Sequence, residues 1–268
     1  MKINPITNVV VFKKKFNSVF NSIKTENPLF EEFIESVIKK NYNIYIIGGF
    51  LRDVANDKIS RDVDIMVSLP YVELDALIKE KLIVFQQNRL KGYKLKFNTI
   101  TVDCWSEDNN WAFEKKLIKR NDKYLDSIAN GTFFNFDSIV LHLNTLKLHT
   151  KNYNHCIKEG KLDILKKNKT YKNSNPTSEA NIIKAIYLAK NFDLKFSPEL
   201  QEYIFQQINS FKLRFYSFES RLYDFQNKYD KYKNFLNEEI LSQSISTIIE
   251  EMKKHNNEFE IKNQVKLF

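Results

Sequence analysis

The sequence predicts an α/β head of about 150 residues followed by a helical body. Three observations favour this fold class. Short apolar runs at 43–47 and 63–67 are bounded by glycine or aspartate, as buried strands are. Residues 93–105 alternate apolar and polar positions, which is typical of a half-buried strand or hairpin arm. From about residue 178 the apolar positions recur with helical period.

The first well-signalled helix is expected over residues 27–40. Asn27 is a residue type that caps helices, and Pro28 suits the first helical turn. One face of this helix is apolar and consists of Phe30, Phe33, Ile34, Val37 and Ile38.

The remaining elements follow in order along the chain. We expect a short helix over 50–56, a longer helix over 70–82 and two further strand-like runs within 131–149. In the C-terminal half, an apolar stripe runs along a helix through Ile182, Ile183, Ile186 and Ala189. The predicted domains are therefore a head over residues 1–150, with N-terminal helices, and a helical neck and body over 151–268.

Composition limits the classes of protein to which the chain can belong. Hydrophobic residues make up 43% and aromatic residues 14% of the chain, enough to form a core. Cys104 and Cys156 are the only cysteines and belong to no CxxC pair, so we expect neither a disulfide framework nor a metal–thiolate site. No apolar run approaches the roughly 20 residues of a membrane span. These features predict a cytoplasmic protein with no membrane segment.

The positive charge is concentrated in one region of the chain. The formal net charge is +9, and residues 147–174 contain eight lysines against Glu159 and Asp163. A focused basic stretch binds nucleic acid by neutralising phosphates and releasing counterions. Solvated, lysine-rich loops explain the same composition equally well, so charge alone leaves both interpretations open.

Residues 44–68, IYIIGGFLRDVANDKISRDVDIMVS, contain the strongest chemical signal. Gly48 and Gly49 follow an apolar strand, where the absence of Cβ atoms lets backbone N–H groups approach a ligand. If a helix begins there, its N-terminus favours an anion such as a triphosphate. Arg52 adds a positive charge one helical turn further on.

The second half of this stretch carries paired carboxylates. Asp62 and Asp64 are two residues apart on the predicted strand, so their side chains point to the same face. Neighbouring carboxylates repel each other unless a cation lies between them, and hard divalent ions such as Mg²⁺ prefer oxygen ligands. Asp103, in the segment TITVDCWS, is the candidate for a third carboxylate from a neighbouring strand.

This combination resembles the head domain of class II CCA-adding enzymes and bacterial poly(A) polymerases, within the DNA polymerase beta nucleotidyltransferase superfamily. The family signature, an apolar strand, GGxxRD, about eight residues and then DxD, corresponds to IYIIGGFLRD, VANDKISR and DVDIMV. A looser similarity covers most of residues 27–195: TFFNF resembles the family's FTINA strand, with Asn135 at its Asn position, and 180–199 resembles the helix after the head.

The resemblance implies a fold and a reaction. The sheet would be mixed and mainly antiparallel, flanked by helices, with a helical neck behind it. Asp62, Asp64 and Asp103 would be catalytic and would hold two Mg²⁺ ions, Asp103 on the side of the acceptor. Nucleotide binding would fall to Gly48, Gly49, Arg52, Asp53 and Asn135, with the two glycines and Arg52 on the β- and γ-phosphates of ATP or CTP.

Two family motifs are altered. Ala129, Asn130 and Gly131 replace an Arg-Arg-Asp linked to recognition of the nucleotide sugar. The base-reading EDxxR motif aligns with Thr177, Ser178 and Asn181, and Lys184 stands where the next Arg of that helix would be. A site without these charged groups should discriminate less between bases or use other residues. The helical region is also shorter than the tRNA-clamping body of the family.

The leading hypothesis is therefore a Mg²⁺-dependent transfer of NMP from an NTP to an RNA 3′ end, with tRNA as one candidate. Lys166, Lys167 and Lys169 would help to hold the RNA. The alternatives are the same transfer to a protein or small-molecule acceptor, as in toxin-like enzymes, and an inactive head that only binds RNA. Trp105, Trp111 and Phe113 would either stack on a base or close the end of the core. The oligomeric state is not predicted.

Overall fold

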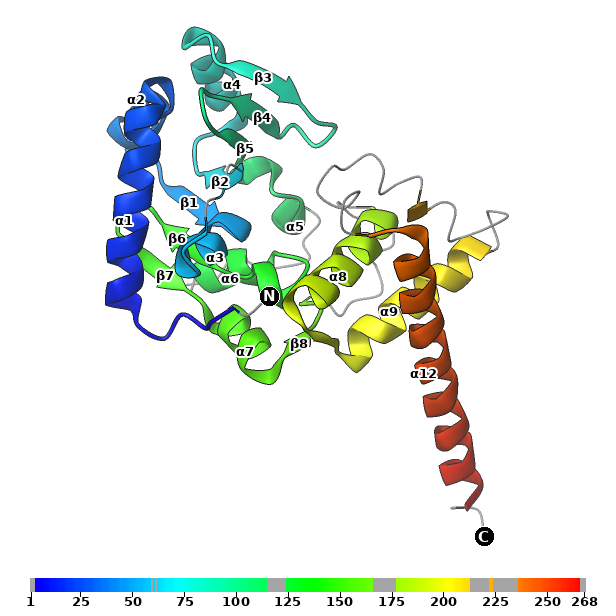
Figure 1. Cartoon of the computed structure of the whole chain (residues 1–268). Helices are drawn as coiled ribbons and strands as arrows, with labels where there is room; N and C mark the ends of the chain where they lie inside the picture. Colours follow the sequence, from blue (N-terminus) through cyan, green and yellow to red (C-terminus); the bar gives the residue numbers. More distant parts are fainter. Residues whose placement is uncertain are drawn as a thin grey trace. The chain divides into compact units, whose positions relative to one another are not determined.

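The computed structural model describes residues 3–58, 60, 62–114, 124–165, 177–212, 222–223 and 236–265 (Figure 1). Its backbone contacts divide the chain into two compact units. One unit runs over Ile3–Glu159 and is called the head below. The other begins at Gly160 and is called the helical unit.

The head is built on a sheet of seven strands in the order β3-β4-β5-β2-β1-β6-β7. Only β2 and β5 run parallel among these neighbours, and the other five pairs are antiparallel. The expectation of a mixed, mainly antiparallel sheet is thus confirmed. The strands are β1 (Ile44–Ile47), β2 (Asp62–Val67), β3 (Val84–Gln87), β4 (Tyr93–Lys96), β5 (Thr101–Ser106), β6 (Val140–His142) and β7 (Lys147–His149).

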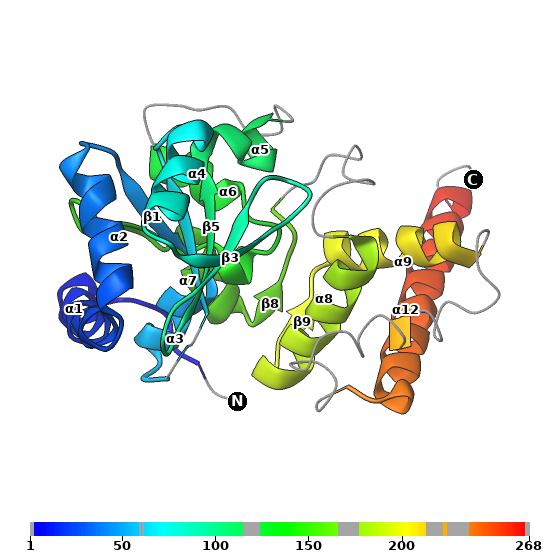
Figure 2. The same cartoon turned by 90° about the horizontal axis from the view of Figure 1, so that it is seen from above.

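Helices cover both faces of this sheet. Helices α1 and α2 lie on one side, and α5 and α6 lie on the other (Figures 1 and 2). The helices of the head are α1 (Val9–Glu26), α2 (Pro28–Lys39), α3 (Gly49–Ala55), α4 (Tyr71–Glu80), α5 (Trp111–Glu114), α6 (Tyr124–Asn130) and α7 (Lys151–Glu159). Two 3-10 turns, η1 (Glu107–Asn109) and η2 (Asn135–Asp137), complete the described part of the head.

Helix α2 begins at Pro28, as the sequence predicts, but Asn27 does not cap it with its side chain. The Asn27 Nδ2 donates to the Ile23 carbonyl and to Thr99 Oγ1, while its Oδ1 accepts from the Thr99 N–H. The side chain therefore ties the end of α1 to the β4–β5 turn. On the predicted apolar face Ile38 is 39% exposed, whereas the other four residues are buried.

Two further differences concern strands. Strand β3 was not expected, because all four of its residues are exposed and no apolar face marks it. Its hydrogen bonds to β4, rather than burial of side chains, define it. The segment TFFNF does not form a strand: Asn135–Asp137 folds into a 3-10 turn, and the following β6 provides the pairing with β1.

The helical unit contains α8 (Ser178–Phe192), α9 (Pro198–Lys212), α12 (Glu238–Val265) and two short parallel strands, β8 (Lys161–Leu162) and β9 (Lys195–Phe196). The Thr177 hydroxyl accepts a hydrogen bond from the Ala180 N–H and caps α8. Ile182, Ile183 and Ile186 are buried, so the predicted apolar stripe faces the interior of this unit. Asp193 ends the helix in a left-handed conformation.

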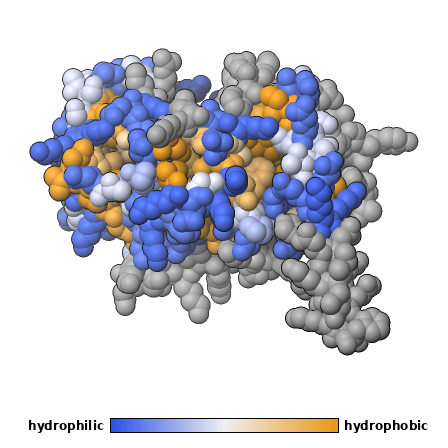
Figure 3. Space-filling model, turned by 60° about the horizontal axis from the view of Figure 1, so that its bottom comes forward, coloured by the Kyte–Doolittle hydropathy of each residue, from blue (hydrophilic) through white to orange (hydrophobic). Residues whose placement is uncertain are grey.

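The surface is mixed in character. In the view of Figure 3, hydrophilic residues are interspersed with smaller hydrophobic patches. Among the residues that the structure describes, no helix combines the length and the hydropathy needed to cross a bilayer.

Candidate active site

The three predicted carboxylates lie on one face of the head sheet. Asp64 of β2 is the direct partner of Asp103 of β5, and Asp62 is the partner of Thr101. Side chains alternate between the two faces along a strand, and direct partners share a face. Val63 and Ile65, which alternate with the aspartates, are buried on the opposite face. The β2–β5 register thus brings together carboxylates that are far apart in the sequence.

The carboxylates differ in exposure and surroundings. Asp62 is exposed, and Asp64 and Asp103 are half-buried. Burial raises the pKa of Asp103, the positive charge of Lys94 opposes that rise, and the negative charge of Asp62 adds to it. Lys94 Nζ lies 3.9 Å from Asp103 Oδ2, and its strand β4 places it directly beside Asp103. Lys94 therefore compensates part of the negative charge on this face.

The donor chemistry of this face fits a hard divalent cation, since three carboxylates supply only oxygen ligands. Within the part of the chain that the structure describes, however, no three His, Cys, Asp or Glu side chains are gathered closely enough to hold a metal ion. Mutual repulsion between adjacent carboxylates and the attraction between Asp103 and Lys94 both favour such a separation. The face thus has oxygen ligands suited to a divalent cation, and its carboxylates would have to move closer together to share one.

Gly48 lies next to this face. Its φ of 77° and ψ of −127° are a conformation that L side chains rarely adopt. A Cβ at this position would lie 3.7 Å from Asp64 Oδ2, so the turn between β1 and α3 comes close to the carboxylate. The Gly48 N–H donates to the Ile139 carbonyl at 2.9 Å and so extends the β1–β6 pairing. Of the two glycine amides predicted to face a phosphate, the one from Gly48 is thus already engaged.

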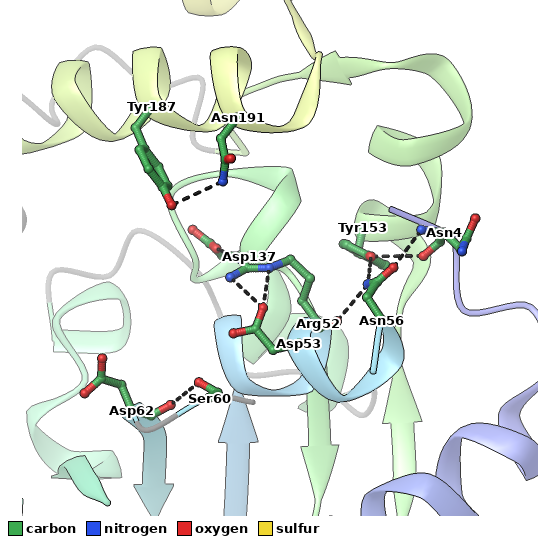
Figure 4. A network of polar contacts seen from close by, with 10 residues as sticks. All are labelled: Asn4, Arg52, Asp53, Asn56, Ser60, Asp62, Asp137, Tyr153, Tyr187 and Asn191. Carbon is green, nitrogen blue, oxygen red and sulfur yellow. Dashed lines mark hydrogen bonds and ion pairs between the residues drawn. The ribbon is translucent and has the colours of Figure 1, made fainter. Parts of the chain in front are cut away.

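Arg52 is 7% exposed and held between two carboxylates (Figure 4). Its guanidinium contacts Asp53 Oδ1 at 3.2 Å and Asp137 Oδ1 at 3.2 Å. The guanidinium also lies over the Phe136 ring, 4.9 Å from the centroid. Asp137 was missed, because no local pattern indicates that the turn after Asn135 returns to α3.

The same network extends to the C-terminal end of α3, where Asn56 is the C-cap residue (Figure 4). The Asn56 Nδ2 donates to the Arg52 carbonyl and to the Tyr153 hydroxyl, at 2.8 and 3.3 Å. The Tyr153 hydroxyl donates in turn to the Asn4 carbonyl at 3.0 Å. Asn135, the predicted nucleotide-binding residue of η2, is 5% exposed. These contacts fix the turn, α3 and η2 as one assembly next to the carboxylates.

A hydrophobic cluster covers the other end of the carboxylate face. Tyr45, Ile47, Met66 and Val140 of the sheet pack with Ile128 and Ala129 of α6, and Trp105 and Phe113 lie against this cluster. The two aromatic residues thus close the end of the core, which is one of the two roles expected of them. Nothing is described of the Trp111 side chain.

Other predicted positions lie in the helical unit. Lys166, Lys167 and Lys169 lie outside the described residues. At the altered base-reading positions, Thr177 caps α8, Ser178 Oγ donates to Gln207 Oε1 at 2.8 Å, and Asn181 is 2% exposed. These three residues, which the resemblance aligns with a base-reading motif, thus take part in helix capping and packing.

The fold of this chain, but not its sequence, has counterparts among known proteins. No protein-family model matches the sequence, and a search of curated proteins finds no significant match. Among solved structures, a CCA-adding enzyme with ATP matches with a TM-score of 0.58 at 17% identity, over 92% of this chain and 55% of that one. The chain has the fold of CCA-adding enzymes.

Two further structures agree. The CCA-adding enzyme of Thermotoga maritima complexed with tRNA gives a TM-score of 0.59 at 14% identity, over 92% of this chain and 55% of that one. A tRNA nucleotidyltransferase with a primer tRNA and an incoming ATP analogue gives 0.51 at 17%, over 74% and 56%. The chain spans about half the length of these enzymes. At these identities the likeness establishes the fold.

Proposed function

We propose that this protein is a Mg²⁺-dependent nucleotidyltransferase that transfers NMP from an NTP to the 3′ end of an RNA and releases pyrophosphate. The observation that carries the proposal is the β2–β5 register, which sets Asp64 beside Asp103 with Asp62 on the same face. Carboxylates placed side by side destabilise a sheet, so the pairing of Asp64 with Asp103, with Asp62 on the same face, favours a role in binding cations.

Asp62, Asp64 and Asp103 are the residues that would hold Mg²⁺. The ions, when bound, would lower the pKa of the acceptor hydroxyl and stabilise the charge on the leaving pyrophosphate. The turn at Gly48 and Gly49 would lie against the triphosphate, because only glycine lets the backbone approach so closely. Arg52 is neutralised by Asp53 and Asp137, so its first role is to hold the turn in place.

In the proposed transfer, one bond forms at the α-phosphorus of the NTP and one bond breaks. The oxygen of the RNA 3′ hydroxyl forms a bond to the α-phosphorus of the NTP, and the bond from that phosphorus to the bridging oxygen of the β-phosphate breaks. Pyrophosphate leaves, and the hydroxyl proton passes to solvent or to a carboxylate.

Two observations favour RNA as the acceptor. The shared fold with CCA-adding enzymes favours it, as does the basic stretch of the sequence. The base-reading motif is replaced by residues that cap and pack α8, so we expect broader use of NTPs than a selective enzyme shows.

A labelling experiment tests the function. The full-length protein is incubated with each α-labelled NTP, Mg²⁺ and total RNA, and RNA and protein are then separated. Label on RNA that disappears in Asp62→Ala supports the proposal. Label on protein would move the same chemistry to a protein acceptor, and label on neither, with RNA binding equal in the parent and Asp62→Ala, would indicate an inactive RNA-binding head.

The role of the lysine cluster needs a separate measurement. Replacing Lys166, Lys167 and Lys169 by Gln should reduce the salt dependence of RNA binding by about 0.7 per lost phosphate contact. An unchanged slope would remove these lysines from the RNA-binding surface.

A further inference from the structure

The carboxylate face of the sheet continues onto the β3–β4 hairpin, where it becomes basic. The register sets Gln86 beside Lys94, Lys94 beside Asp103, and Asp103 beside Asp64. A second row, parallel to the first, runs through Val84, Lys96, Thr101 and Asp62. Direct partners share a face, so Lys94 and Lys96 lie on the same side of the sheet as all three carboxylates. We call these two rows the open face.

The side chains of the open face are accessible. Lys96, Gln86 and Asp62 are exposed, and Val84 is 64% exposed. The Lys94 and Asp103 side chains are 47% and 46% exposed. The next residues along the strands, Met66 and Trp105, belong to the cluster under α6, so the hydrophobic cover begins where the open face ends.

We propose that the open face binds the 3′-terminal nucleotides of a single-stranded RNA, with the backbone phosphates over Lys94 and Lys96 and the 3′ hydroxyl at the carboxylates. This inference rests on the proposed function and names the surface for its acceptor. The lysines attract phosphates, and the carboxylates repel them. Under the proposed function the 3′ hydroxyl attacks the NTP at the carboxylates, so the 3′ end lies there and the phosphates of the preceding nucleotides extend over the lysines.

The dimensions fit a short stretch of nucleic acid. Neighbouring strands lie about 4.8 Å apart, so the distance from β5 to β3 is about 10 Å. A stacked single strand advances about 3.4 Å per nucleotide, which places two or three phosphates over the hairpin.

Lys94 also couples RNA binding to the state of the Asp103 carboxylate. Without RNA it lies 3.9 Å from Asp103 Oδ2 and offsets that charge. A phosphate over the hairpin competes for the same ammonium group, so binding of the acceptor would draw Lys94 away from Asp103. This exchange would free the Asp103 carboxylate for its proposed role as a metal ligand when the RNA end is in place.

The first test measures RNA binding without any NTP, so it does not depend on catalysis. The affinity of the full-length protein for a fluorescent single-stranded RNA is followed by anisotropy as NaCl rises from about 50 to 200 mM. For Lys94→Gln/Lys96→Gln we expect the slope of log K against log[salt] to fall by about 1.4, from two phosphate contacts at about 0.7 each.

Lys39→Gln/Lys40→Gln is the matched control. It removes two charges from the end of α2, where the side chains are 77% and 50% exposed and paired with Glu35 and Glu73. Its slope should stay at the parent value, and Lys94→Arg/Lys96→Arg should keep the parent slope. The inference is overturned if the Lys94/Lys96 and Lys39/Lys40 Gln variants give the same slope.

The second test measures the direction of the strand. Both cysteines of the chain are buried, so Lys96→Cys provides an exposed thiol. An RNA with a thiol-reactive group near its 3′ end should crosslink to Lys96→Cys faster than an RNA with the group at its 5′ end. The RNA with the group near its 3′ end should crosslink more slowly to Lys39→Cys than to Lys96→Cys. Equal rates would contradict the proposed direction. If the parent binds RNA in this way but transfers no nucleotide, the proposed function fails while the binding surface stands.

Discussion

Asp64 and Asp103 are direct partners in the parallel β2–β5 pair and face each other across the strand boundary. Like charges in this position destabilise a sheet, and Lys94 on the next strand offsets only part of the repulsion. The arrangement costs stability, which supports the proposal that these carboxylates bind cations.

Asp64→Asn should separate stability from activity. Removing one of the two opposed charges should leave the free energy of unfolding unchanged or raise it by about 0.2–1 kcal/mol. Nucleotide transfer should fall by at least about 100-fold, because the metal ions that Asp64 would hold stabilise the charge that develops on the transferring group. Urea denaturation and the labelled-NTP assay measure the two effects. Asp57→Asn, which removes an exposed carboxylate paired with Lys15, serves as the control and should retain activity.

Arg52→Ala should destabilise the head strongly. The change leaves Asp53 and Asp137 without the guanidinium that both contact, and breaking such a buried pair costs about 3–5 kcal/mol. Lys15→Ala breaks an exposed pair with Asp57 and should cost less than about 1 kcal/mol. Urea midpoints of the two variants provide the comparison. Similar small losses in both would show that the Arg52 network does not hold the turn.

Gly48→Ala and Gly49→Ala should differ, although the two glycines are adjacent. Gly48 has a φ of 77°, and an L residue held in such a conformation costs about 1–3 kcal/mol. Gly49 begins α3 with an ordinary φ, and an added Cβ would meet Arg52 Nη2 at 3.4 Å, a contact that a small shift of the side chain relieves. Thermal unfolding should therefore show the larger loss for Gly48→Ala. The order would reverse if contact with Arg52 outweighed backbone strain.

His142 should make the head less stable in mild acid. Burial lowers its pKa, with a smaller contribution from Lys147. The neutral ring is thus favoured in the folded state, and this contribution is present above the ordinary histidine pKa of about 6.5 and lost as the pH falls through the lowered value. The urea midpoint of the parent should fall more between about pH 7.5 and 5 than that of His142→Gln. NMR titration of the ring measures the pKa directly, and a value above 6.5 would contradict the argument.

Local pattern predicted much of this protein. Pro28 marks the start of α2, and the apolar runs around Gly48 and Val63 correspond to β1 and β2. The period of 3.6 residues around Ile182 corresponds to α8. These signals are reliable because each depends on which residues a short segment can bury or hydrogen-bond by itself.

Long-range pairing explains what was missed. Asn27 has the chemistry of a cap, yet Thr99 of a distant turn takes its hydrogen bonds. Exposed β3 has no apolar face to reveal it, since pairing with β4 alone makes it a strand. The partnership of Arg52 with Asp137 likewise depends on where η2 returns to the sheet.

Sequence pattern alone indicates the chemical types of the site: two glycines after a strand, an arginine one helical turn further on, and two aspartates two residues apart on a strand, with Asp103 as a candidate from another strand. Which of these side chains lie next to one another depends on the tertiary structure. The register of β2, β5 and β4 places Asp64, Asp103 and Lys94 in one row, and a shift of one residue in either pairing would send a side chain to the other face. Hydrogen bonds between strands set that register, so it cannot be read from the sequence of any one strand.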